Sequence, residues 1–106
     1  MVKQYDIYWI KLDPTIGSEI NKIRPGVIIS PDESNKHLNT VIIAPITATI
    51  NNFPMRVEII LNAKNGQVAL DQIRSIDKSR LLNQMGSLKQ LEIENLKNIL
   101  REYLID

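Results

Sequence analysis

The first two thirds of the chain carry apolar patterns typical of β-strands. Residues 5–12 are rich in aromatic and β-branched side chains, and Tyr5, Ile7 and Trp9 fall on one face of a strand. The even positions 8, 10 and 12 make the opposite face apolar as well. We therefore expect this strand to be covered on both sides, for example by a second subunit.

Further strands are predicted between residues 27 and 70. They cover residues 27–30, 40–46, 55–61 and 67–70. Pro31 and the polar residues 32–39 end the first of these strands, and Asn65-Gly66 is typical of a turn into the last.

Two of these strands carry an expectation of their own. Pro45 cannot donate to a β-ladder, so it predicts a bulge or a strand end in residues 40–46. In residues 55–61 the alternation places Arg56 and Glu58 outward and Val57 and Ile59 inward.

The period changes near the C-terminus, where the pattern predicts one long helix over Leu88–Leu104. Ser87 followed by Gln90 has the spacing of a capping box. An apolar stripe at helical spacing follows and is interpreted as a core face; it comprises Leu88, Leu91, Leu96, Ile99, Leu100, Tyr103 and Leu104.

Length and composition favour one strand-rich domain spanning residues 1–106, folded as a small barrel or sandwich. Its hydrophobic fraction of 43% is enough for a core, and no apolar run approaches the length of a membrane span. The default location is therefore the cytoplasm. A formal net charge of +1 excludes nucleic-acid binding through a strong global field, so any RNA binding must use a local groove.

The titratable residues exclude several kinds of site. The chain has no cysteine and one histidine, so a thiolate metal site is excluded and structural zinc is not expected. The polar residues 32–39 are expected to form a loop, and His37 within it is interpreted as a surface residue. One histidine also excludes the two-imidazole scheme that some ribonucleases use.

A few residues stand where chemistry is feasible. Proline disfavours the α region for the residue before it, so Arg24 should be extended at a strand entrance, where its fork can face a phosphate. Thr47 ends an apolar strand, where its hydroxyl can project into a cleft. Glu19 and Asp71 are the carboxylates available nearby in the pattern. Each of these residues taken alone is more often an ordinary surface residue.

Several stretches together resemble the motifs of MazF/PemK/Kid toxins, in the same order and at the same intervals over almost the whole chain. They are Ile7–Trp9, Leu12–Glu19, Arg24–Ser30, Val41–Thr47 and Val68–Leu81. Departures occur at Ile23 and Ser18, where some family members carry histidine, and at Ala69, where some carry arginine.

The resemblance implies a mostly β fold, an SH3-like small barrel with a long C-terminal helix, assembled as a homodimer. It also implies a toxin of a type II toxin–antitoxin system, inhibited by an antitoxin whose flexible acidic tail occupies the RNA groove. The implied activity is sequence-specific, ribosome-independent cleavage of single-stranded RNA without a metal or other cofactor. The family's site residues fall on Arg24, Thr47 and Glu19 for catalysis and on Asp71, Gln72, Ser18, Lys22 and Arg74 for substrate binding.

The expected reaction uses the 2′-hydroxyl of the RNA as the nucleophile and leaves 2′,3′-cyclic phosphate and 5′-hydroxyl ends. Arg24 and Thr47 would stabilise the phosphorane, and Glu19 or Asp71 suits proton acceptance better than arginine does. Two alternatives remain open. One is a non-catalytic gyrase-binding toxin of the CcdB type, and the other is an inactive antitoxin-binding module. The presence of all four residues argues against both.

Overall fold

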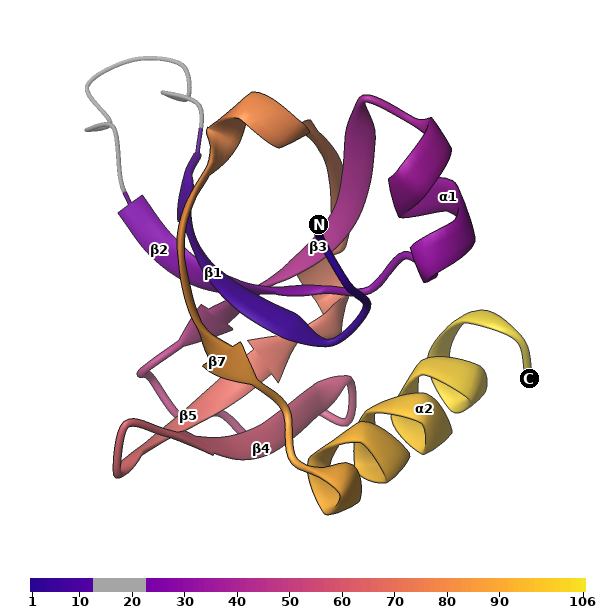
Figure 1. The fold of residues 1–106 in the computed structure, drawn as a ribbon. Helices are drawn as coiled ribbons and strands as arrows, with labels where there is room; N and C mark the ends of the chain where they lie inside the picture. The colour runs from indigo at the N-terminus through magenta and orange to yellow at the C-terminus, as the bar shows by residue number, and fades with distance from the viewer. Residues whose placement is uncertain (13–22) are drawn as a thin grey trace, which may run out of the picture.

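The strands form one strongly curled sheet, and the C-terminal helix packs along its lower part (Figure 1). The structure, a computed structural model, describes residues 1–12 and 23–106. Its strands are β1 (Asp6–Lys11), β2 (Ile23–Ile28), β3 (Thr40–Thr47), β4 (Arg56–Leu61), β5 (Lys64–Ala69), β6 (Arg74–Asp77) and β7 (Leu81–Ser87). The helices are α1 (Asp32–His37) and α2 (Gln90–Leu104), with 3-10 turns η1 (Leu70–Gln72) and η2 (Lys78–Arg80).

β3 is the strand that makes the sheet curl. The strand order is β4-β5-β3-β2-β1-β7, with β6 also paired to β3. One edge of β3 pairs with β2. The other edge pairs with β6 along Thr40–Ile43 and then with β5 at Ile46 and Thr47. The described strands therefore form a half-closed barrel, which confirms the predicted mostly β small-barrel class.

Pro45 lies at this exchange of partners. It pairs with Gly26 of β2, between the last β3 residue facing β6 and the first facing β5. β3 continues past the proline to Thr47, so the predicted bulge or strand end is wrong. On the edge of β3 where β6 gives way to β5, Pro45 pairs with neither strand, so the N–H that proline lacks is not needed there.

Two apolar clusters lie on the two faces of β1, as its pattern predicted. Ile7 belongs to the larger cluster, which also includes the fully buried Leu96 of α2. Ile10 belongs to the second cluster, among β1, β2, β3 and β6. Gly26 of β2 faces Ile10, and a Cβ on that glycine would lie 2.5 Å from the Ile10 Cδ1 atom. Trp9 remains 39% exposed, so the described residues leave its part of the strand partly uncovered.

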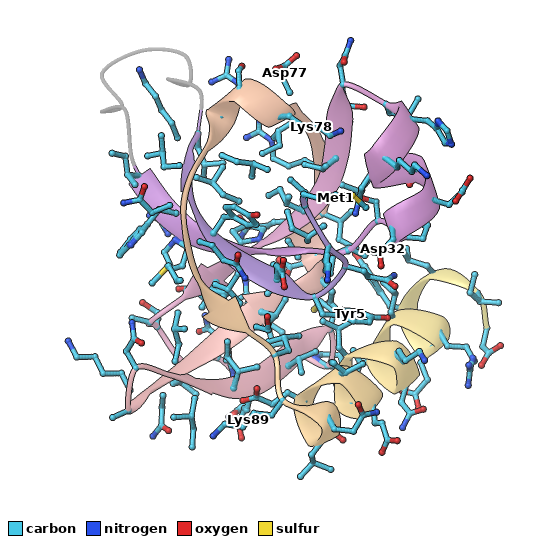
Figure 2. The ribbon with its side chains drawn as sticks, viewed as in Figure 1. Met1, Tyr5, Asp32, Asp77, Lys78 and Lys89 are labelled. Carbon is cyan, nitrogen blue, oxygen red and sulfur yellow. The ribbon has the colours of Figure 1, made fainter. Side chains whose placement is uncertain are left out.

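Tyr5 lies just before β1 (Figure 2), and its main chain ties the start of that strand to its neighbours. Its N–H donates to the Ile28 carbonyl at 2.7 Å, and its carbonyl accepts from the Leu88 N–H at 3.0 Å. Tyr5 has a φ of 71°, which is uncommon for a residue with a side chain. These two bonds fix the chain where β1 meets the ends of β2 and β7.

The polar segment 32–39 was predicted as a loop, and the structure corrects this: Asp32–His37 form α1. Acidic residues lie in its first turn and basic residues in its last, which favours the helix dipole. Asn35 is buried, and its side-chain amide donates to the Ser30 carbonyl at 2.8 Å. The main-chain carbonyl of Asn35 accepts from the Lys78 ammonium. These tertiary bonds hold a helix too short to be stable alone. The interpretation of His37 as a surface residue is confirmed, since its side chain is 65% exposed beside Glu33.

The predicted Asn65-Gly66 turn is also wrong. β4 and β5 pair as far as Leu61 and Lys64, so the turn consists of Asn62 and Ala63. Both have positive φ, 51° and 64°, as a tight hairpin turn of the favoured twist requires. Asn62 tolerates this region through its short polar side chain.

Helix α2 begins later than its apolar stripe suggested. Ser87 ends β7, and the residue before the helix is Lys89, whose N–H donates to the Glu92 carboxylate at 2.8 Å (Figure 2). The predicted capping box at Ser87 and Gln90 is therefore wrong by two positions. The other oxygen of Glu92 accepts from the Ile60 N–H at 2.9 Å, which protects the edge of β4.

The predicted stripe of α2 is only partly a core face. Leu96 is fully buried, and Ile99 and Leu100 pack against the larger cluster. Leu91 and Leu104 remain 69% and 58% exposed. In the described ranges, no helix has both the length and the apolar character needed to cross a membrane.

Candidate active site

Arg24 and Thr47 line one open pocket of about 400 Å³. β2 carries Arg24, and the last residue of β3 is Thr47. The walls come from Trp9 of β1, from the β4–β5 hairpin, and from Met85 of β7. Strands that are distant in sequence thus bring together the two residues that the sequence predicted for catalysis.

Arg24 is held in extended backbone, as the following proline predicted. It pairs with Ile10 of β1, and Pro25 pairs with Trp9. The residue is half-buried, so part of its side chain is withdrawn from water while the pocket stays open. A planar guanidinium at the wall of such a pocket is suited to bind a phosphate.

The Thr47 hydroxyl has a defined orientation. Its Oγ1 atom accepts a hydrogen bond of 3.1 Å from the Thr49 N–H. A hydroxyl that already accepts still has its own hydrogen to donate. On β5, Gly66 lets the hairpin approach closely, because a Cβ there would lie 3.3 Å from both the Thr47 carbonyl oxygen and Ile46 Cγ2. Thr47 can therefore be a second donor to an anionic group in the pocket.

The loop after Thr47 is clamped by Gln67, a residue that the sequence reasoning missed. Gln67 pairs with Thr47 in the β3–β5 ladder and is 2% exposed. Its Oε1 atom accepts from the Asn51 N–H at 3.1 Å, and its Nε2 atom donates to the Asn51 carbonyl at 2.8 Å. The signal available in the sequence was a polar side chain within the otherwise apolar or small run Gly66–Leu70.

Replacing Gln67 with methionine should lower the free energy of unfolding by about 1–3 kcal/mol, because the main-chain N–H and the main-chain carbonyl of Asn51 both lose their partner. Denaturant unfolding measures this change. The matched control is Gln90→Met on the exposed first turn of α2, which should change stability by less than about 0.5 kcal/mol. Equal effects of the two substitutions would show that the clamp contributes nothing.

Asp71 forms an ion pair with Arg56 outside this pocket. The Arg56 Nε atom lies 2.7 Å from Oδ1 of Asp71, and Nη2 lies 3.2 Å from Oδ2. The Arg56 side chain is only 7% exposed, so the prediction that it points outward is wrong. The hydrogen bond from Arg56 holds the pKa of the Asp71 carboxyl below its ordinary value, against the opposing effect of burial. A carboxylate stabilised in this way is a poor proton acceptor.

The other predicted site residues lie in different places. η1 contains Asp71 and Gln72, and β6 contains Arg74, whose backbone pairs with Ile43. None of these residues lines the pocket of Arg24 and Thr47. The remaining predicted residues, Glu19, Ser18 and Lys22, lie outside the residues that the structure describes.

The comparisons with known proteins point to one family. A family model described as PemK-like, MazF-like toxin of type II toxin–antitoxin system matches residues 3–104. The chain is 38% identical to endoribonuclease MazF of Staphylococcus saprophyticus over 104 residues, which cover 92% of this chain and 87% of the relative. It is 39% identical to endoribonuclease MazF of Staphylococcus epidermidis, with 93% and 90% covered.

The fold is also found among solved structures. An endoribonuclease in complex with its cognate antitoxin, from mycobacterial species, superposes with a TM-score of 0.82. The match covers 98% of this chain and 95% of the other chain at 20% sequence identity. At that identity the likeness shows a shared fold.

Proposed function

The chain belongs to the PemK-like and MazF-like toxins of type II toxin–antitoxin systems and is an endoribonuclease of that family, and we propose that it cleaves single-stranded RNA at the pocket of Arg24 and Thr47. The observation that carries the proposal is the meeting of these two side chains at one open cavity. We further propose that residues 1–106 act as one domain and cut at a short sequence without the ribosome.

The proposed reaction needs no metal or other cofactor. The 2′-oxygen of the RNA attacks the adjacent phosphorus, the bond from phosphorus to the 5′-oxygen breaks, and the products are a 2′,3′-cyclic phosphate and a 5′-hydroxyl. Arg24 stabilises the added negative charge on the phosphorane, and the Thr47 hydroxyl donates a second hydrogen bond. DNA lacks the 2′-hydroxyl and is not cut.

Protons must also be moved in this reaction. The 2′-hydroxyl loses a proton to a base as it attacks, and the 5′-oxygen takes one as it leaves. Of the two carboxylates predicted from the sequence, Asp71 is engaged by Arg56 and does not line the pocket. We therefore assign proton acceptance to Glu19. Asp71, Gln72, Ser18, Lys22 and Arg74 remain proposed substrate contacts.

Thr47→Val tests the use of this pocket. The substitution keeps the shape of the side chain and removes its hydroxyl. We therefore expect single-turnover cleavage of a fluorescent single-stranded RNA to slow by about 10- to 100-fold, the value of one hydrogen bond to a charged group. Thr49→Val is the matched control, because Thr49 contributes only its backbone N–H to the hydrogen bond with Thr47. A Thr47→Val rate equal to that of the control would contradict the proposal.

Two partners follow as proposals. We propose a homodimer, supported by the exposed Trp9 of β1 and Leu82 of the adjacent β7. Sedimentation equilibrium at micromolar concentration should give twice the 12.1 kDa chain mass, and a monomer would contradict it.

We also propose a cognate antitoxin whose acidic tail occupies the RNA pocket, where Arg24 and Lys64 offer positive charge. A polyglutamate peptide should then raise the KM for RNA and leave kcat unchanged. A fall in kcat alone would place the peptide elsewhere.

A further inference from the structure

Helix α2 packs along β4, the edge strand of the sheet (Figure 1). An open cavity of about 460 Å³ lies between the loop after β3, strands β4 and β5, and α2. Its lining is unusually rich in carboxamides, and the residues are Asn51, Asn52, Gln67, Asn95 and Asn98. Phe53, Arg56 and Glu58 complete the polar and aromatic part of the wall. None of these residues was assigned a role by the proposed cleavage chemistry.

The wall on the loop side is fixed before any ligand arrives. Gln67 holds both polar groups of the Asn51 main chain, at 3.1 and 2.8 Å. Two residues further on, the Phe53 ring has the Arg56 guanidinium carbon 5.2 Å from its centroid. Arg56 is held in turn by Asp71 at 2.7 Å. A pre-ordered wall lowers the entropy cost of binding.

The chemistry of the cavity suits an uncharged, flat ligand with a hydrogen-bonding edge. The positive charge of Arg56 is already paired, and Glu58 adds a negative charge that repels a phosphate. The Phe53 side chain is 51% exposed and offers a surface for stacking. Asn95 and Asn98 are three residues apart on the exposed face of α2, so their amides lie on the same side of the helix. Amides that donate and accept at one edge are the side chains that read a nucleobase.

The cavity is also connected to the candidate active site. It shares Glu58 and Asn95 with a neighbouring hollow of about 420 Å³. That hollow shares Asn65 and Gly66 with the pocket of Arg24 and Thr47. A single strand held at Arg24 can therefore follow the β4–β5 hairpin towards the carboxamides.

We propose that this carboxamide cavity binds an unpaired nucleobase of the RNA substrate, some nucleotides away from the cut. The inference rests on the proposed RNA cleavage and adds a second, base-reading site to it. Phe53 stacks on the base, and Asn98 with Asn95 reads its edge. A base with an exocyclic amino group fits better than one without, because Glu58 can accept from that group. Adenine is therefore preferred to thymine or uracil.

The test uses DNA heptamers, which lack the 2′-hydroxyl and are not cut. Titration with oligodeoxyadenylate should shift the NMR signals of the Asn95 and Asn98 side-chain amides, and oligothymidylate should bind more weakly. Phe53→Leu should weaken oligodeoxyadenylate binding by about 5- to 100-fold, the range for one stacked base. Asn98→Ala, which favours the helix, should remove the preference for adenine over thymine. Asn83→Ala, at an exposed position of β7, is the control and should bind as the wild type does.

Binding of oligodeoxyadenylate by Phe53→Leu with wild-type affinity would overturn the inference, as would shifts confined to residues around Arg24 and Thr47. So would a response of the Asn95 and Asn98 amides to polyglutamate and not to the oligonucleotide, since the cavity would then accept a protein segment. If the wild type binds as described but cuts no RNA, the proposed function fails and the base site stands. If RNA is cut and these amides do not respond, the base site alone fails.

Discussion

Arg24→Ala is expected to slow the single-turnover cleavage of single-stranded RNA by about 10²–10³-fold. This is the usual loss when one pre-organised donor to a transition-state anion is removed. The structure gives the reason: Arg24 is half-buried at the wall of the Thr47 pocket, and its backbone is held in β2 ahead of Pro25, so its charge lies at the place where the phosphate would bind. The measurement is the rate at saturating enzyme, which separates the chemical step from binding.

Arg24→Lys is the matched control for the charge. Lysine keeps the positive charge but not the planar fork, so it should recover only part of the lost rate. Both variants should have the wild-type free energy of unfolding within about 0.5 kcal/mol, because Arg24 is not part of either apolar cluster. A wild-type rate in Arg24→Ala would remove this residue from the mechanism.

Asp71→Asn is expected to lower the free energy of unfolding by about 1–3 kcal/mol at neutral pH. The substitution leaves the Arg56 guanidinium, which is 7% exposed, without its counter-charge. The expected loss is smaller than for a fully buried pair because the Asp71 side chain keeps 24% exposure. Denaturant unfolding of the two proteins at several pH values gives the difference.

The pH dependence identifies Asp71 as the cause. Its pKa in the folded protein is lowered from 3.8, chiefly by the hydrogen bond from Arg56. The folded state therefore binds this proton less readily than the unfolded state, so the stabilisation is fully present above about pH 4 and is lost as the pH falls through the folded pKa. The difference in free energy of unfolding between the wild type and Asp71→Asn should therefore shrink as the pH falls below 4. A gap that stayed constant from pH 7 to pH 3 would assign it to packing instead of charge.

The sequence predicted what depends on local pattern and failed where distant partners decide. Apolar periodicity predicted the strands that overlap β1 to β5 and the helix containing Leu96. It did not predict β6 and β7. By contrast, α1 is held by a bond from Lys78, 43 positions along the chain, to the main-chain carbonyl of Asn35, and no local pattern reveals that contact. The hairpin turn at Asn62-Ala63 was missed because the Asn65-Gly66 dipeptide is the stronger turn signal.

The same division applies to the candidate site. Local pattern showed only that Arg24 precedes a proline and that Thr47 ends a strand, which is common for ordinary surface residues. The resemblance to the family motifs singled them out as site residues. Gln67 could not be assigned, because its role lies in two hydrogen bonds to Asn51, sixteen positions away. The sequence predicted Asp71 as one of two carboxylates suited to accept a proton. Only the structure shows that this carboxylate forms an ion pair with Arg56.

The most direct measurement is cleavage of a long single-stranded RNA by the purified protein in excess chelator, with analysis of both new ends. We expect 2′,3′-cyclic phosphate and 5′-hydroxyl ends from the wild type. Arg24→Ala should give none of these ends at the same enzyme concentration and time, and the matching DNA should not be cut. Ends bearing a 5′-phosphate, or cleavage that disappears when the chelator is added, would contradict attack by the RNA's own 2′-hydroxyl at this pocket.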